Sequence, residues 1–247
     1  TYYLWQSVVE AINARLSGDP VRAYELLIEQ YDRLLGTKRY GIGLSDPLLK
    51  FVMRETAESA LLAGLLPQAL SLFEQLAGAP RTGGSTVFAR EAHLRAALIH
   101  RLFGSTHTAA AHLRQASRVP RTSSWLEDQL DVDQELLEAL QGHDGPNVTF
   151  STLVDLSCSN MGELWPFTVI AVHAYGIITG RRDQARARLE GLAAAGYGHG
   201  RSGHASTVLP ALLAYEQLLS GDVPAARSMI EQVSDDTWTV VLVRALI

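Results

Sequence analysis

The sequence predicts an all-α protein, a right-handed superhelical solenoid of about six helix-turn-helix repeats that forms one domain over residues 1–247. Three observations lead to this prediction. A short frame of glycine, alanine and a large apolar residue recurs along the chain, helical apolar spacing precedes each glycine, and polar linkers separate the units. One helix pair cannot bury its apolar face alone, whereas copies that stack side by side can.

The frame places an alanine five residues after a glycine and a large apolar residue nine residues after it. Five glycines satisfy both conditions: Gly18, Gly64, Gly104, Gly180 and Gly221. Gly142 is a sixth anchor, although Asn147 and Ser151 break the rule after it. The anchors are spaced 38 to 46 residues apart. This range of periods indicates a solenoid of stacked units.

Each unit is predicted to contain two helices, one before its glycine and one after it. The glycine suits a left-handed cap at the end of the first helix, where a side chain would clash. Asp19 and Asp222 can cap the second helix, whose first turn tolerates Pro20 and Pro224. The alanine allows two helices to cross closely, and the large residue lies on the same face and fills the core. A seventh unit is expected to begin at residue 235.

Polar linkers that contain glycine or proline are predicted at 77–86, 117–124 and 193–206. His199 and His204 in the last linker invite a metal-binding interpretation, but zinc sites usually need four closely spaced ligands, so a polar linker is favoured. The segment RTGGST at 81–86 resembles a phosphate-binding turn. Such turns normally follow a strand, and a helix is expected here, so an ordinary connection is favoured.

Composition and charge restrict the classes of protein. Apolar residues make up 47% of the 247 residues and charged residues 19%, which is typical of a folded chain. A net charge of −5 argues against a nucleic-acid-binding chain. No apolar run is long enough to span a membrane, and the single cysteine, Cys158, fits a reducing cytoplasm. The chain lacks an initiator methionine and stops in an apolar run, so we expect it to be part of a longer protein.

The glycine–alanine–apolar frame resembles the tetratricopeptide repeat, and its long period is similar to the sensor region of MalT-type, LuxR-family ATPase regulators. The resemblance implies a cytoplasmic domain that senses a ligand or protein for transcriptional control, between a nucleotide-binding switch and a helix-turn-helix. This chain contains neither a GxxxxGK[ST] motif nor a basic recognition helix. The alternative is a stand-alone protein- or peptide-interaction scaffold, including peptide-pheromone sensors built from similar repeats.

An α-helical enzyme is the third possibility. The histidines are scattered along the sequence, and no serine or cysteine lies in a recognisable nucleophile elbow. We therefore expect neither catalytic activity nor a cofactor or metal.

The concave groove is the expected binding surface of a solenoid. In the tetratricopeptide register, the groove positions lie ten, six and three residues before each glycine. Polar or charged residues occupy five of them: Arg15, Arg54, Glu58, Arg101 and Tyr215. The others are mostly aliphatic, including Val8, Ile12, Leu94, Leu98 and Ile170. Such a groove suits a peptide, a partner helix or a small amphipathic ligand. The alternative is that these aliphatic residues are core and the register differs.

Two titratable residues interrupt a second pattern. Seven residues before the glycine, four units have alanine, whereas Glu135 and His173 occupy the other two positions. A register shift or a wider gap between helices would explain both. The sharper hypothesis is a polar opening for a ligand between units four and five, where Trp165 and Tyr175 supply aromatic walls.

Opposite charges follow one another along the chain. Residues 81–121 contain seven arginines and one acid, whereas residues 122–144 contain seven acids and no lysine or arginine. We expect unit three and the first helix of unit four to attract each other across their boundary, with Arg101 as an exception left for a ligand. The alternative is two separate solvated faces, the basic one binding an anionic partner.

Overall fold

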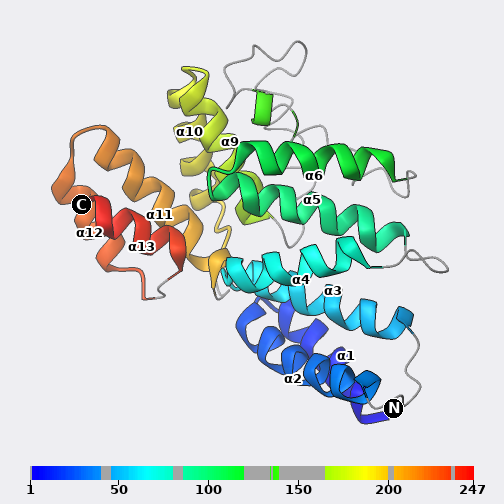
Figure 1. The fold of residues 1–247 in the computed structure, drawn as a ribbon. Helices are drawn as coiled ribbons and strands as arrows, with labels where there is room; N and C mark the ends of the chain where they lie inside the picture. Colours follow the sequence, from blue (N-terminus) through cyan, green and yellow to red (C-terminus); the bar gives the residue numbers. More distant parts are fainter. Residues whose placement is uncertain are drawn as a thin grey trace. The chain divides into compact units, whose positions relative to one another are not determined.

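The computed structural model describes residues 2–39, 46–79, 86–119, 134, 136–138, 165–199, 203–234 and 237–247. These residues form helices and turns and contain no strand, which confirms the all-α prediction (Figure 1). The helices are α1 (Tyr2–Leu16), α2 (Pro20–Arg39), α3 (Asp46–Leu62), α4 (Leu66–Gly78), α5 (Thr86–Leu102), α6 (Thr106–Arg118), α9 (Trp165–Ile178), α10 (Arg182–Ala194), α11 (His204–Leu219), α12 (Val223–Glu231) and α13 (Trp238–Leu246). Among the described helices, none combines the length and apolarity that a membrane crossing requires.

The chain divides into two compact units. The first unit comprises residues 1–61 and 65–145 and contains α1, α2, α4, α5, α6 and most of α3. The second unit comprises Leu62–Gly64 and residues 146–247 and contains α9 to α13. The sixth anchor, Gly142, and most of the acidic segment lie outside the described residues, as does Glu135.

A glycine with a left-handed backbone follows the first helix of each described pair. The φ angle is +88° at Gly18, and it lies between +72° and +84° at Gly64, Gly104, Gly180 and Gly221. The amide of the next residue donates to the carbonyl five residues before it, as from Asp19 to Ala14 at 2.9 Å. The same bond recurs four times: Leu65 to Ala60, Ser105 to His100, Arg181 to Gly176, and Asp222 to Gln217. This Schellman pattern pairs carbonyls at the helix end, and it confirms the predicted glycine caps.

The two predicted aspartate caps are also present. Asp19 accepts a hydrogen bond at Oδ1 from the amide of Arg22, at 3.0 Å. Asp222 accepts one in the same way from the amide of Ala225, at 3.0 Å. Each aspartate satisfies an amide that has no partner within its own helix.

The alanine and the large apolar residue of the frame are buried at every described anchor. The alanines are Ala23, Ala69, Ala109, Ala185 and Ala226. The large residues are Leu27, Phe73, Leu113, Leu189 and Ile230. The frame therefore marks the contact between the two helices of a pair, as the sequence predicted. Alanine allows the helix backbones to approach closely, and the large side chain fills the space beside the contact.

The cores extend from one pair to the next. In the first unit, Leu137 joins a cluster that contains Leu94 of α5 and Leu113 of α6. In the second unit, α11 contributes to two clusters, one shared with α9 and α10 and one shared with α12 and α13. The helix α11 is therefore the centre of the second unit. The first residue of α11, His204, is buried. Because α11 begins there, the linker that was predicted to reach residue 206 ends at Gly203.

Ala185→Leu tests whether the alanine of the frame occupies a close helix contact. The larger side chain should overpack α10 against its neighbours and lower the free energy of unfolding by about 1–3 kcal/mol in urea titrations. Ala187→Leu is the matched control, because Ala187 lies on the same helix and is exposed. The control should change stability by less than about 0.5 kcal/mol. Equal behaviour of the two variants would contradict a special role for the frame.

Candidate functional site

Three of the charged residues predicted to line a groove in the first unit, Arg15, Arg54 and Glu58, form ion pairs between first helices. Arg15 of α1 lies 2.9 Å from Glu55 of α3. Arg54 of α3 donates to both carboxylate oxygens of Glu91 on α5, at 3.0 and 2.8 Å, and also pairs with Glu55. These pairs join α1 to α3 and α3 to α5. Arg15 and Arg54, which were predicted to meet a ligand, are therefore engaged with protein carboxylates.

A second set of contacts continues the network. Arg95 of α5 donates from Nε to Glu58 of α3 at 2.9 Å, and its Nη2 lies 3.7 Å from Glu91. Arg90, also on α5, donates to the carbonyl of Val119 at 2.7 Å. Arg90, Arg95, Glu58 and Glu91 are all buried. Arg90 and Arg95, two arginines of the basic segment 81–121, therefore have hydrogen-bond partners within the first unit. The partner of Arg95, Glu58, belongs to the preceding helix pair.

The electrostatics of the network favour the charged forms of Glu58 and Arg54 despite burial. Burial raises the pKa of Glu58, but the positive charges of Arg95, Arg54 and Arg15 outweigh it, and the pKa is lowered overall. Burial likewise opposes the charge of Arg54. The hydrogen bond to Glu91 and the nearby carboxylates overcome this effect and raise its pKa. Removing one partner would therefore leave an uncompensated buried charge.

The aliphatic groove positions of the first unit are mainly core. Val8, Leu94 and Leu98 are buried, whereas Ile12 is half-buried. Arg101, expected to remain available to a ligand, is only 9% exposed. In this unit the alternative interpretation, that the aliphatic residues belong to the core, agrees better with their burial.

The second unit contains an apolar groove of about 280 Å³. It is lined by one face each of α9, α11 and α13. The lining residues are Ile170, His173, Ala174, Ile177, Ile178, Ala211, Leu212, Tyr215, Trp238, Thr239, Leu242 and Val243. Three residues singled out in the sequence, Ile170, His173 and Tyr215, therefore border one cavity. Ile178 and Leu242 are 43% and 52% exposed, so the apolar surface continues from the cavity to solvent.

A buried polar cluster joins two walls of this groove. Nε2 of His173 on α9 lies 2.6 Å from Oε1 of Glu216 on α11. Arg182 of α10 donates to the other oxygen of Glu216 at 2.8 Å and to its backbone carbonyl at 2.9 Å. The His173 ring also meets Tyr215 edge to face, with ring centroids 6.2 Å apart. Glu216 thus holds three helices of the second unit together.

Burial and the charge of Arg182 lower the pKa of His173, although Glu216 opposes the shift. A neutral His173 donates its proton from Nε2 to the carboxylate. His173 replaces the alanine that other units have at this position, and its partner belongs to α11. The opening predicted between units four and five involves unit four, most of which lies outside the described residues.

Of the two aromatic residues predicted beside His173, only Tyr175 has a side chain in the described part of the chain. Tyr175 is buried and is absent from the lining. Trp165 begins α9, and its side chain lies outside the described part of the chain. The sequence did not anticipate the contribution of Trp238, Thr239 and Leu242 from α13. An apolar run at 238–246 was the available signal.

The two histidines of the last predicted linker have different surroundings. His199 is exposed, whereas His204 is buried between the rings of Phe167 and Trp238, with centroids 5.3 and 5.1 Å away. Burial lowers the pKa of His204 to about 3, so the ring is neutral. His204 is thus part of an aromatic cluster in the core, which disfavours the metal interpretation of this linker.

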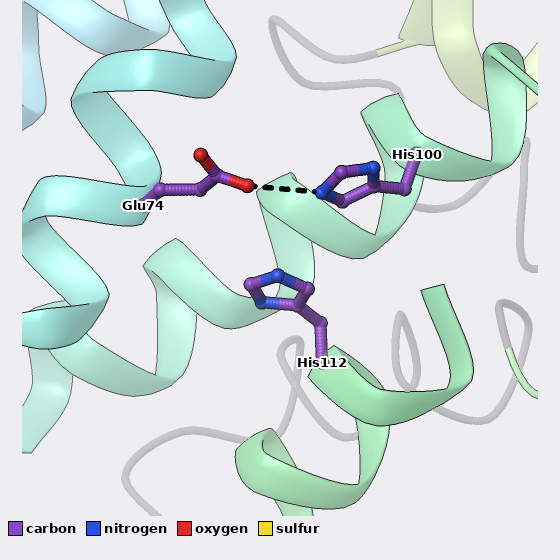
Figure 2. A group of neighbouring side chains, drawn as sticks. All are labelled: Glu74, His100 and His112. Carbon is purple, nitrogen blue, oxygen red and sulfur yellow. Dashed lines mark hydrogen bonds and ion pairs between the residues drawn. The ribbon is translucent and has the colours of Figure 1, made fainter. Parts of the chain in front are cut away.

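A different group of histidines was not anticipated. Figure 2 shows His100 of α5 and His112 of α6 turned toward Glu74 of α4. One ligand atom from each residue lies within 4.8 Å of the others. The residues are 26 and 12 positions apart in the sequence, so no spacing motif reveals them.

Comparisons of the chain with protein-family models, with curated proteins and with solved structures return no match.

Glu58→Gln tests the importance of the buried ion network. The amide cannot balance the charge of Arg95, so the free energy of unfolding should fall by about 3–5 kcal/mol in urea titrations. Glu25→Gln is the control, because the Glu25 side chain is exposed and its nearest guanidinium is 3.7 Å away. The control should remain within about 0.5 kcal/mol of the parent. A loss below about 1 kcal/mol for Glu58→Gln would contradict a charged, mutually dependent network.

Proposed function

We propose that the chain is a tetratricopeptide-like repeat domain whose second unit binds the apolar face of an amphipathic helix from a partner protein. The observation that carries this proposal is the groove formed by α9, α11 and α13, which is apolar along its length. Consecutive first helices of a solenoid present one continuous surface, which is where such domains commonly bind partners.

Two features support the solenoid. The same glycine turn, with the same hydrogen bond to the carbonyl five residues earlier, ends the first helix of every described pair. The same buried alanine and large apolar residue follow it. Identical local geometry at an almost constant period is what stacking into a right-handed superhelix requires.

The dimensions of the groove favour a helix over a small molecule. A volume of about 280 Å³ lies below the usual range of about 300–1,000 Å³ for small-molecule pockets. Exposed Ile178 and Leu242 extend the apolar surface beyond the cavity. An amphipathic helix places apolar anchors at i, i+3 or i+4, and i+7, and therefore covers a cavity together with its rim.

The polar cluster beneath the groove supports binding rather than catalysis. His173, Glu216 and Arg182 bond to one another, so their hydrogen-bonding capacity is largely used within the protein. Their role in the proposal is to fix the spacing of α9 and α11. A groove with fixed walls binds a partner with a smaller loss of conformational entropy.

The broader role that we propose is sensing in a cytoplasmic transcriptional regulator of the MalT-type, LuxR family. A bound partner would then shift the equilibrium of switch domains encoded elsewhere in the gene. The second candidate is a stand-alone interaction scaffold. The full coding sequence distinguishes them: a nucleotide-binding motif before the repeats and a helix-turn-helix after them support the regulator, whereas repeats alone support the scaffold.

Selection from a displayed library of 14-residue helical peptides tests the groove. Peptides that bind the purified chain should carry apolar residues at i, i+3 or i+4, and i+7. Leu242→Glu should weaken their binding by at least about tenfold, because it places a charge on the groove wall. Affinities can be measured by fluorescence anisotropy with a labelled selected peptide.

Val241→Glu is the matched control. Val241 and Leu242 are neighbours on α13 and are about equally exposed, at 51% and 52%, but only Leu242 lines the groove. The control should keep the parent affinity. Selected peptides without an apolar helical face, or equal weakening by both substitutions, would contradict the proposed site.

A further inference from the structure

Glu74, His100 and His112 bring three metal-ligand groups together on three helices of the first unit. Nε2 of His100 lies 3.1 Å from Oε1 of Glu74. The ring of His112 stacks on that of His100, with centroids 5.3 Å apart and an angle of 25° between the planes. In Figure 2 the Glu74 carboxylate and a ring nitrogen of each histidine converge on a common space between the helices.

A fourth residue fixes the orientation of His112. Nδ1 of His93 on α5 lies 3.1 Å from Nδ1 of His112, so one of these nitrogens donates to the other. When Nδ1 of His112 is the donor, its Nε2 carries the lone pair and can bind a metal. Metal-binding histidines commonly use their second nitrogen in such a hydrogen bond, which sets the tautomer and the ring orientation.

The separations are compatible with one metal ion. Two ligand atoms that each lie about 2.0–2.1 Å from a tetrahedral zinc ion are about 3.4 Å apart. The nitrogen and oxygen of His100 and Glu74 are already 3.1 Å apart, and the three ligand atoms lie within 4.8 Å of one another. Small side-chain rotations would therefore complete the geometry. The Glu74 side chain is 47% exposed, which leaves it free to rotate and gives an ion access from solvent.

We propose that Glu74, His100 and His112 form a binding site for a divalent transition-metal ion of the zinc type. Two imidazoles and one carboxylate suit zinc, cobalt or nickel, whereas calcium and magnesium prefer an all-oxygen shell. Three protein ligands leave a fourth position for water. The ion would connect α4 of one helix pair to α5 and α6 of the next.

Isothermal titration of the metal-free chain with zinc chloride tests the site. The parent should bind one zinc ion per chain through these residues, and its melting temperature should rise with zinc concentration. Cobalt(II) should give the visible absorption of a tetrahedral or five-coordinate site. His112→Gln should lower the zinc affinity by more than about tenfold, because even outer-shell changes cost about 10–100-fold.

Glu74→Gln provides the decisive variant, because a change at a half-exposed side chain leaves the fold intact, and it should also weaken zinc binding at least about tenfold. His107→Gln is the matched control, since His107 is an exposed histidine on the same helix as His112. His199→Gln controls for the exposed histidine of the second unit. Both controls should bind zinc like the parent.

Absence of zinc binding at micromolar concentrations would overturn the proposal. Unchanged affinity in Glu74→Gln, or an equal loss in His107→Gln, would also overturn it, because either result places the ion elsewhere. Circular dichroism of each metal-free variant establishes that it is folded before affinities are compared.

Discussion

The helix pairs depend on a glycine whose backbone conformation is unfavourable for residues with a side chain. At each described anchor this glycine has a positive φ, and the following amide closes the helix end. The turn reverses the chain within three residues, so the alanine and the large apolar residue of the second helix meet the first helix at a fixed place. Because the turn depends only on residues close to one another in the sequence, the same turn can form in each helix pair independently of the others. The stacking of pairs then adds the apolar cores.

The first helices of the two units use polar residues in different ways. In the first unit, Arg54, Glu58, Glu91 and Arg95 connect α3 to α5 through buried charge pairs. A buried pair contributes little net stability compared with apolar packing, but it makes a shift in register costly. In the second unit a single carboxylate, Glu216, joins α9, α10 and α11, and the neighbouring surface remains apolar.

The local features of the fold could be predicted from the sequence, because each depends on residues close to one another. The turns at Gly18 and Gly221, their aspartate caps and the buried Ala185 follow from one frame. Side-chain partners across pairs could not be predicted. Arg54 and Glu91 are 37 residues apart, and their contact depends on the relative position of two stacked helices. The register that placed Arg54 and Glu58 in an open groove came from the resemblance to the tetratricopeptide repeat. In the first unit, the ion pairs of both residues with α5 argue against this register.

The same limit applies to the candidate sites. His173 was identified because it breaks the alanine pattern, but its partner Glu216 has no sequence signal, since it lies 43 residues away. Glu74, His100 and His112 come from three helices and share no motif. His204 appeared to belong to a polar linker, whereas its burial beside Phe167 and Trp238 depends on the packing of α11. Long-range packing decides each of these outcomes.

Replacement of one turn glycine is the most direct test of whether the helix pairs depend on a left-handed glycine turn. A methyl group at Gly180 would meet no atom within 4 Å, so any loss of stability in Gly180→Ala comes from its φ of +72°. The free energy of unfolding should fall by about 1–2 kcal/mol. Gly191→Ala is the control within α10, where a methyl group also meets open space, and it should stabilise the protein by about 0.5–1 kcal/mol. Urea unfolding of both variants measures the contrast. Stabilisation by Gly180→Ala would contradict the left-handed turn as the basis of the helix pair.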